Sequence, residues 1–278
     1  MGWLTDPFVE NLFMQRALLA GVLVSVACAV VGTFVVLRGM AFLGDALAHG
    51  VLPGIAAAVL LGLPSIAGAV AGAVVMIGGV SLVTRRTRLS ADTAIGLLFV
   101  GMLALGVVIV SRSDSFAGDL TQILFGEILG IDENAIWGQL AATVVVVVVA
   151  AVCARPFLLL AVDPEQAEVS GFRAARYHAV MLALVALTVV ISFRTVGTLL
   201  VFGMLLAPAG VGALVAHRVG VMVAVATAVG VVSVVAGLEL SYYYDLAAGA
   251  TIVLVAVGLF FATLLVQSVR RPRARVAA

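Results

Sequence analysis

The sequence predicts an all-α protein that crosses a membrane about nine times. Of its 278 residues, 64% are hydrophobic and 10% are charged, and the mean hydropathy is +1.29. Soluble domains carry roughly a quarter charged residues, so a chain this apolar could not keep its surface wetted. The apolar runs are continuous and do not alternate as the strands of a membrane barrel would. Together these observations indicate a polytopic helical membrane protein.

A helix needs about 20 apolar residues to cross the hydrocarbon core of a bilayer. Nine segments approach or reach this length, and they make residues 1–278 a single transmembrane domain without a soluble part. The short connections around Leu63 and Arg194 also permit half-spans or re-entrant hairpins, so eight to ten spans are compatible with the pattern. The nine candidates are residues 17–37, 41–62, 65–84, 92–111, 135–154, 177–193, 195–216, 219–238 and 247–268.

The arginines predict which side of the membrane each connection faces, because cytoplasmic loops are enriched in basic residues. Residues 84–90 and the tail 269–276 are basic and contain no acidic residue, whereas residues 112–133 are net acidic. Alternation through nine spans from a cytoplasmic C-terminus places the N-terminus outside. The start of the chain lacks the basic residues and cleavage site of a secretory signal, so we expect the first span to be retained.

The second segment places Asp45 and His49 four residues apart, within the sequence GDALAHGVLPG. Residues at this spacing share one face of a helix, which is how helical metal sites present two ligands to one ion. An aspartate and a histidine suit Zn²⁺ and other first-row divalent ions. Pro53 has no N–H, so it should also leave the carbonyl of His49 without its helical partner.

Two other interpretations of this pair stay open. Asp45 and His49 could have a purely structural role and hydrogen-bond each other or a neighbouring helix. They could also relay a proton, because histidine titrates near neutral pH. For a metal site, two ligands do not fill a four-coordinate shell. A second copy of the chain across a two-fold axis would supply a second pair.

The two long connections hold further candidates. In the acidic one, Glu127, Asp132 and Glu133 could attract cations at an entrance, although a solvated acidic loop explains them more simply. In the connection after the fifth span, a short cytoplasmic helix is predicted over 163–171. Its signals are the N-cap Asp163, Pro164 at the first position, the acidic residues Glu165 and Glu168, and Gly171 as the stop.

The later spans carry weaker signals. Pro208 predicts a kink in the seventh span. Glu239 and Asp245 flank the run SYYY, which suits the membrane interface, and His178 and His217 fall at cytoplasmic span ends with no role assigned. The chain has no GxxxxGK[ST] phosphate loop and no nucleophilic triad, so we do not expect an enzyme. A net charge of +1 gives no reason to expect nucleic acid as a partner.

The stretch FVVLRGMAFLGDALAHGVLPGIA closely resembles the membrane permeases of bacterial zinc- and manganese-uptake ABC transporters. These share Leu-Arg, a short apolar link, Gly-Asp-Ala, a small residue, His and then Leu-Pro-Gly. The resemblance continues in FMQRALLAG, in the region from DPEQAEVSGFRAARYH to LLAPA, and in LSYYYDLAAGATIVLV, so it covers nearly the whole chain. Ala48, where serine is more frequent, and the glutamate of LFGEILG depart from the pattern.

The resemblance implies a fold like that of type II ABC importers and a subunit that hydrolyses no ATP itself. It implies that two copies pair in the bacterial cytoplasmic membrane, and that two separate ATPase subunits bind beneath them and use the ATP. An extracytoplasmic solute-binding protein would deliver the ion. The family's metal ligands correspond to Asp45 and His49, and its coupling helix to 163–171. The cargo would be Zn²⁺ first, because of the histidine, and Mn²⁺ next, with no permanently bound cofactor.

Two other functions stay open. A proton-coupled secondary transporter would use Asp45 and His49 for protons, but it gives no reason for a capped cytoplasmic helix. An ABC permease for a metal chelate or a vitamin would leave the pair with a structural role.

Overall fold

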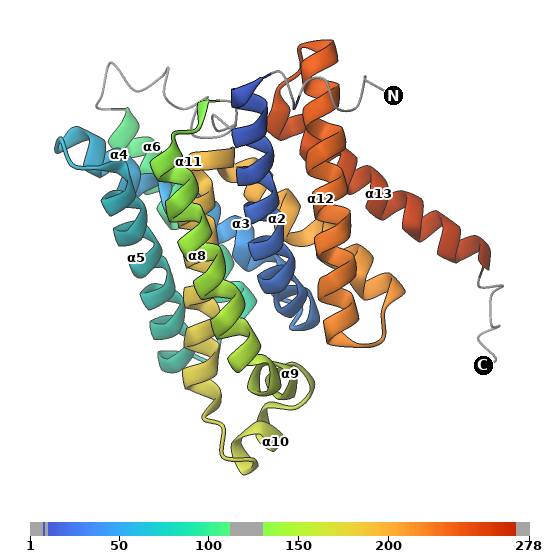
Figure 1. The fold of residues 1–278 in the computed structure, drawn as a ribbon. Coiled ribbons are helices and arrows are strands. Elements are labelled where there is room, and N and C mark those ends of the chain that lie inside the picture. The colour runs from blue at the N-terminus through green and yellow to red at the C-terminus, as the bar shows by residue number, and fades with distance from the viewer. Residues whose placement is uncertain (1–7, 9–10, 112–129, 271–278) are drawn as a thin grey trace.

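The computed structural model describes residue 8, residues 11–111 and residues 130–270, and this part of the chain is almost entirely helical (Figure 1). Glu127 therefore lies outside the described residues. The helices are α2 (Leu12–Leu37), α3 (Ala41–Gly50), α4 (Leu52–Leu60), α5 (Ser65–Arg86), α6 (Ala91–Val110), α8 (Glu133–Val152), α9 (Ala154–Val162), α10 (Pro164–Val169), α11 (Ala174–Val215), α12 (Val219–Tyr244) and α13 (Ala248–Arg270).

The described residues form eight helical segments that are long and apolar enough to cross a membrane, and a shorter apolar helix, Leu200–Val215. These nine segments correspond in order to the nine predicted ones, so the prediction of a polytopic all-α protein is confirmed. The ends of α2 and α12 are among those that differ most. α2 begins at Leu12 instead of residue 17, and α12 continues to Tyr244 instead of residue 238, because its helical backbone includes the tyrosine run.

The predicted second span is divided into α3 and α4 at Val51. This residue keeps helical torsion angles, φ −81° and ψ −19°, so α4 continues in the direction of α3 and the two form one candidate span, Ala41–Leu60. Pro53 lies in the first turn of α4, where its missing N–H leaves no internal helical bond unmade. The break is therefore local, and in the chain it comes directly after the turn that contains Asp45 and His49.

α11 contains a chain reversal at Gly197. This glycine has φ 75° and ψ 165°, a conformation open essentially only to glycine. Figure 1 shows the first half of α11 running from the α10 end of the bundle and the second half returning. In the returning half, Val201 lies beside Cys28 and Leu205 lies beside Gly32, so this half is parallel to α2. The two predicted spans 177–193 and 195–216 are thus separate passes joined at one glycine.

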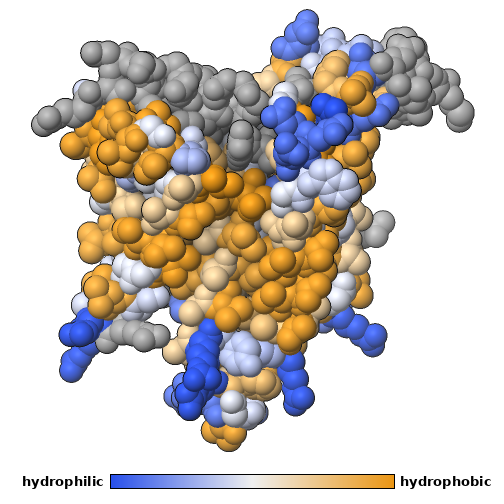
Figure 2. All heavy atoms as spheres, turned by 60° about the vertical axis from the view of Figure 1, so that its left-hand side comes forward, coloured by the Kyte–Doolittle hydropathy of each residue, from blue (hydrophilic) through white to orange (hydrophobic). Residues whose placement is uncertain are grey.

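The bundle has two polar ends and an apolar middle. On the face drawn in Figure 2, hydrophobic side chains cover the middle and hydrophilic ones gather toward the ends. At one end, Arg16 of α2 forms an ion pair with Glu133 of α8, with Nη2 2.7 Å from Oε1. At the other end, Arg38 after α2 meets His178 of α11, near the short helices α9 and α10. The side of the membrane that each end faces stays a prediction.

Several hydroxyl side chains in the interior are satisfied within their own helices. Thr33, Thr188 and Thr251 each donate to the carbonyl four residues earlier, at 2.7 to 2.8 Å. A bilayer interior offers no water to such groups, so bonding back to the helix removes most of the penalty of placing them there. The pair Asp45 and His49 has no comparable backbone partner among the bonds of the described residues, which sets it apart from these structural polar groups.

Candidate functional site

Asp45 and His49 lie together on α3, as their spacing predicts. Nε2 of His49 is 3.4 Å from Oδ1 of Asp45. Both side chains are half-buried, with 24% of the Asp45 side chain and 28% of the His49 side chain exposed. The imidazole nitrogen and the carboxylate oxygen therefore converge on one point that is accessible from outside the chain.

The pair lies on the one strip of α3 that the described helices leave partly open. Six of the ten residues of α3 are buried, and the four that are not are Ala41, Phe42, Asp45 and His49. Positions 42, 45 and 49 follow the period of an α-helix and form a single face. We refer to Ala41, Phe42, Asp45 and His49 as the open strip of α3. The candidate ligands thus face away from the core of their own chain.

Neighbouring helices hold α3 by its buried faces. A side chain at Gly44 would meet Leu205 and Phe202 of α11, and one at Gly50 would meet Met76 of α5. Because the two glycines carry no side chain, these helices come close to the backbone of α3. This contact fixes the rotation of α3 about its axis, and with it the direction in which the Asp–His pair points.

Phe99 of α6 packs against the imidazole from the side. Its ring centre lies 5.8 Å from that of His49 with an angle of 65° between the planes, and 5.6 Å from that of Phe42. Edge-to-face contacts of this kind restrict the ring orientation, so Phe99 supports a histidine whose Nε2 is turned toward Asp45. No pattern in the sequence marks Phe99, because it belongs to another helix about fifty residues further on.

The separation of the two donor atoms suits a divalent metal ion. With metal–ligand bonds of about 2.1 Å, a tetrahedral site places neighbouring donors roughly 3.4 Å apart and an octahedral site roughly 3.0 Å apart. The Nε2–Oδ1 distance of 3.4 Å equals the tetrahedral separation, and a small side-chain rotation would bring it to the octahedral one. Nδ1 of His49 is buried and has no hydrogen-bond partner among the described residues, so Nε2 is the nitrogen that faces a ligand.

The described part of one copy supplies only part of a metal shell. Among the described residues, no group of three His, Cys, Asp or Glu side chains comes together. A transition-metal ion takes four to six ligands. The described His, Cys, Asp and Glu side chains therefore leave part of the shell of an ion at Asp45 and His49 unfilled.

The expectation that Pro53 leaves the carbonyl of His49 without its helical partner stays a prediction. Pro53 has no N–H to donate to this carbonyl, and the amide of Val51 donates to the carbonyl of Leu47 at 3.2 Å.

The acidic candidates of the long connection do not form a second site in the part of the chain that the structure describes. Glu133 is paired with Arg16, and Asp132 precedes α8 without a side-chain capping bond. Glu127 falls outside the described residues, so its placement is not tested. A cation entrance at these residues stays a prediction.

The short helix expected after the fifth span is present as α10. Oδ1 of Asp163 accepts hydrogen bonds from the amides of Glu165 at 2.9 Å and Gln166 at 3.1 Å. Pro164 occupies the first turn, and Gly171 turns the chain at φ 86°. The start and stop signals in the sequence therefore form the local structure that they predict.

α10 presents an exposed outer surface at the end of the bundle. Glu165 and Glu168 are exposed, and Val169 is 89% exposed, whereas Ala167 is buried against the bundle. An apolar residue so exposed beside two carboxylates suits contact with another protein. Sequence reasoning missed Val169, and it also missed α9, which it treated as part of an irregular connection.

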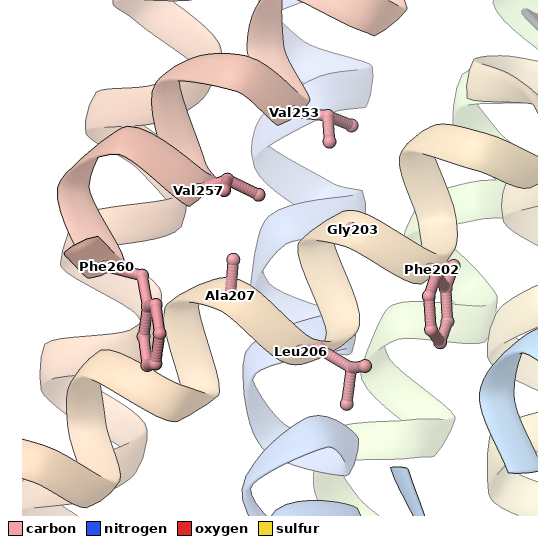
Figure 3. A pocket seen from close by; sticks show the side chains of 7 residues that line it. All are labelled: Phe202, Gly203, Leu206, Ala207, Val253, Val257 and Phe260. Carbon is pink, nitrogen blue, oxygen red and sulfur yellow. The ribbon is translucent and has the colours of Figure 1, made fainter. Parts of the chain in front are cut away.

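A recess elsewhere in the bundle has the wrong chemistry for an ion (Figure 3). It encloses about 320 Å³ between the second half of α11 and α13, and its side chains are all apolar. The lining residues are Phe202, Gly203, Leu206, Ala207, Val253, Val257 and Phe260. The candidate metal site therefore rests on the open strip of α3 alone.

Comparison with known proteins places this arrangement in a family. Residues 10–267 match the model of the ABC 3 transport family. The chain is 37% identical to the manganese transport system membrane protein MntC of Halalkalibacterium halodurans, over 92% of this chain and 87% of that one. It is 35% identical to the chelated iron transport system membrane protein YfeD of Yersinia pestis, over 97% of this chain and 90% of that one.

A solved structure agrees with this match. PsaBC from Streptococcus pneumoniae in complex with Fab has a TM-score of 0.83 to this chain at 30% identity, and the match covers 94% of each chain. Family model, relatives and fold all extend over nearly the full length. This multi-pass membrane protein belongs to the ABC 3 transport family.

Proposed function

We propose that this chain is the permease subunit of an ATP-driven importer of divalent first-row metal ions, in which Asp45 and His49 ligate the passing ion. The observation that carries the proposal is the 3.4 Å separation of Nε2 and Oδ1 on the open strip of α3. Membership of the ABC 3 transport family and relatives named for manganese and iron transport support the class of cargo.

In this proposal, two copies of the chain complete the site. Each copy offers one carboxylate and one imidazole from a strip that its own helices leave open. A two-fold axis beside the strip would bring four ligands around one ion. Phe42, 42% exposed on the same strip, would be buried by the same contact.

The other partners are assigned to the two ends of the bundle. The end that carries α9, α10 and the start of α11 faces the cytoplasm of the bacterium, which agrees with the basic connections placed there. α10 then contacts an ATPase subunit, one for each permease copy, and that subunit uses the ATP. A solute-binding protein delivers the ion at the opposite end, where the N-terminus lies outside. No cofactor is held between transport cycles.

We place Mn²⁺ before Zn²⁺ as the cargo, which reverses the order expected from the histidine alone. Six relatives are named for manganese and two for iron, and none of these eight is named for zinc. One oxygen and one nitrogen donor per copy, with no thiolate, accept Mn²⁺ readily. Half-exposed ligands also suit an ion that must leave as well as enter.

A permease for a metal chelate is the second candidate, because the Yersinia pestis relative is named for chelated iron. In that case Asp45 and His49 would orient α3 and would not touch the metal. A proton-coupled secondary transporter has less support, since family membership points to an ABC system.

The test is Mn²⁺ uptake into proteoliposomes that contain the permease with its ATPase and solute-binding protein. We expect Asp45→Ala and His49→Ala to abolish uptake while the complex still assembles. The matched controls are Asp92→Ala and His217→Ala, which replace exposed residues and should leave uptake intact. Uptake of free Mn²⁺ and Zn²⁺ at the wild-type rate in both site variants would refute ligation, and uptake of a chelate alone would favour the second candidate.

A further inference from the structure

The corner between α2 and α3 is the structural base of the metal site. Arg38 caps the C-terminus of α2, and α3 begins at Ala41 after only Gly39 and Met40. Asp45 follows one turn later. Because the connection is so short, a displacement of the last turn of α2 must also displace the start of α3. Any element that holds this corner therefore holds the candidate ligands.

Two contacts reach the corner from the elements on either side of α10. The ring of Phe157 in α9 packs edge-to-face on Phe34 in the last turns of α2, with 5.3 Å between ring centres and 68° between planes. Nη1 of Arg38 lies 3.3 Å from Nδ1 of His178 in the first turn of α11, and it also approaches Sδ of Met181 at 3.7 Å. Phe34 and Arg38 are four residues apart, so both contacts act on one face of α2.

The aromatic contact is fully enclosed. Phe157 is 0% exposed and Phe34 is 4% exposed. Interiors packed in this way transmit a displacement, since side chains have no free space into which to move. A movement of α9 is therefore passed to α2 at Phe34.

The hydrogen bond between Arg38 and His178 has a defined donor and acceptor. Arginine only donates hydrogen bonds, so Nδ1 of His178 must accept, and the imidazole is neutral with its proton on Nε2. Arg38 is half-buried, and burial lowers the pKa of its guanidinium, which nonetheless stays charged at neutral pH. A hydrogen bond between a half-buried cation and a neutral partner contributes little to the stability of the bundle. We therefore interpret this contact as one that fixes the position of Arg38 relative to α11.

α10 is joined firmly to both contacts. Ala167 is buried, and its carbonyl accepts from the amide of Phe172 at 3.0 Å. The ring of Phe172 packs against Tyr177, 5.6 Å away, and Tyr177 is the neighbour of His178. On the other side, α9 ends at Val162, directly before the N-cap of α10. A push on α10 thus reaches Phe157 through α9 and His178 through the start of α11.

We propose that Arg38, together with the Phe34–Phe157 contact, is a positioning residue that transmits movement of α10 to α3 and so to the Asp45–His49 pair. This inference rests on the proposed function, because it assumes that a partner subunit moves α10. It assigns roles to four residues that do not touch the ion: Phe34, Arg38, Phe157 and His178. The alternative is a brace that only stabilises the bundle.

The test uses the assembled complex and two readouts. The first is hydrogen exchange of the amides of α3, compared between the nucleotide-free and the ATP-bound state. The second is the number of Mn²⁺ ions taken up per ATP hydrolysed. The variants are Arg38→Gln, His178→Ala and Phe157→Leu, with Arg38→Lys as the conservative replacement. Arg86→Gln, an exposed arginine at the end of α5, is the matched control.

We expect ATP to change exchange in α3 of the wild type, and we expect this response to be lost in Arg38→Gln and Phe157→Leu. Uptake per ATP should fall roughly tenfold in these variants, since couplings between sites usually span about 5- to 150-fold. The melting temperature should be unchanged in Arg38→Gln and should fall in Phe157→Leu, which removes part of a buried ring, by too little to explain the loss of uptake. Arg38→Lys, which keeps a long side chain with a charged donor, should recover part of the coupling, and Arg86→Gln should behave as wild type. If Arg38→Gln fails to assemble, His178→Ala gives the same comparison from the other side of the contact.

Three results would overturn the inference: an α3 that does not respond to ATP in the wild type, a response that persists in all of the variants, or a loss of uptake that follows the melting temperature. The proposed function is judged separately. A wild-type complex whose α3 responds to ATP through Arg38, but which moves no metal ion, would refute the metal function and leave the positioning role standing.

Discussion

Nε2 of His49 and Oδ1 of Asp45 lie 3.4 Å apart on the only face of α3 that the described helices leave open. If the imidazole ligates the cargo, its replacement by a carboxylate should change which ions compete. Nitrogen ligands favour Zn²⁺ over Mn²⁺ more than oxygen ligands do. His49→Asp should therefore weaken the inhibition of Mn²⁺ uptake by added Zn²⁺ by about tenfold, or about 1.4 kcal/mol.

The measurement is a Zn²⁺ competition curve for Mn²⁺ uptake in proteoliposomes of the full complex. His217→Asp is the control, because His217 is exposed in the connection between α11 and α12. Its competition curve should match that of the wild type. Identical curves for His49→Asp and the wild type would show that the imidazole does not contact the ion.

Next to the candidate site, α4 and α5 pack with their backbones in close contact. A side chain at Gly54 of α4 would collide with the carbonyl of Gly68 on α5. Gly54→Ala must therefore separate α4 from α5, and we expect a loss of about 1–3 kcal/mol in stability, as for other overpacked interiors. Thermal unfolding of the purified permease measures the loss.

Gly78→Ala is the matched control, since it lies on the same α5 but has open space around it. Alanine favours a helix over glycine, so this variant should be neutral or slightly more stable. Equal melting temperatures for Gly54→Ala and Gly78→Ala would mean that the two backbones do not constrain each other.

The number of spans could be predicted because hydropathy is a property of the local sequence. The break at Val51 was not expected from the sequence, although it lies within one turn of Pro53, a residue type that interrupts helices. The reversal in α11 could be placed only near Arg194. Gly197 carries it, and nothing in the sequence marks this residue among 29 glycines, because its positive φ is required by the packing of two separate passes.

The candidate site could be predicted only as far as one helix reaches. The spacing of Asp45 and His49 predicts a shared face, and the structure shows the two groups on it. Phe99 approaches from a different helix. The other faces of α3 are buried where its glycines let side chains of α5 and α11, which are distant in the sequence, pack close to its backbone. His178 could be given no role from the sequence because Arg38, its partner, lies 140 positions away.

The ion pair between Arg16 and Glu133 should contribute little to stability, because both side chains are at least partly exposed. The Arg16 side chain is 31% exposed and the Glu133 side chain 71%, and pairs this exposed contribute little because water and salt screen them. Glu133→Gln should change stability by less than about 0.5 kcal/mol and uptake by less than about twofold. Thermal unfolding and Mn²⁺ uptake measure the two effects. A loss of uptake with an unchanged melting temperature would instead assign Glu133 to a cation entrance.

The N-cap of α10 gives the most direct test of its proposed contact with the ATPase. Asp163→Ala removes the acceptor of the amides of Glu165 and Gln166, which should destabilise this short helix by about 1 kcal/mol. Because α10 has only six residues, it should then lose its helical shape while the spans remain folded. We expect less ATPase to co-purify with the Asp163→Ala permease, and Asp163→Ser, which keeps a capping oxygen, to restore it. Full co-purification with Asp163→Ala would place the ATPase contact elsewhere on this end of the bundle.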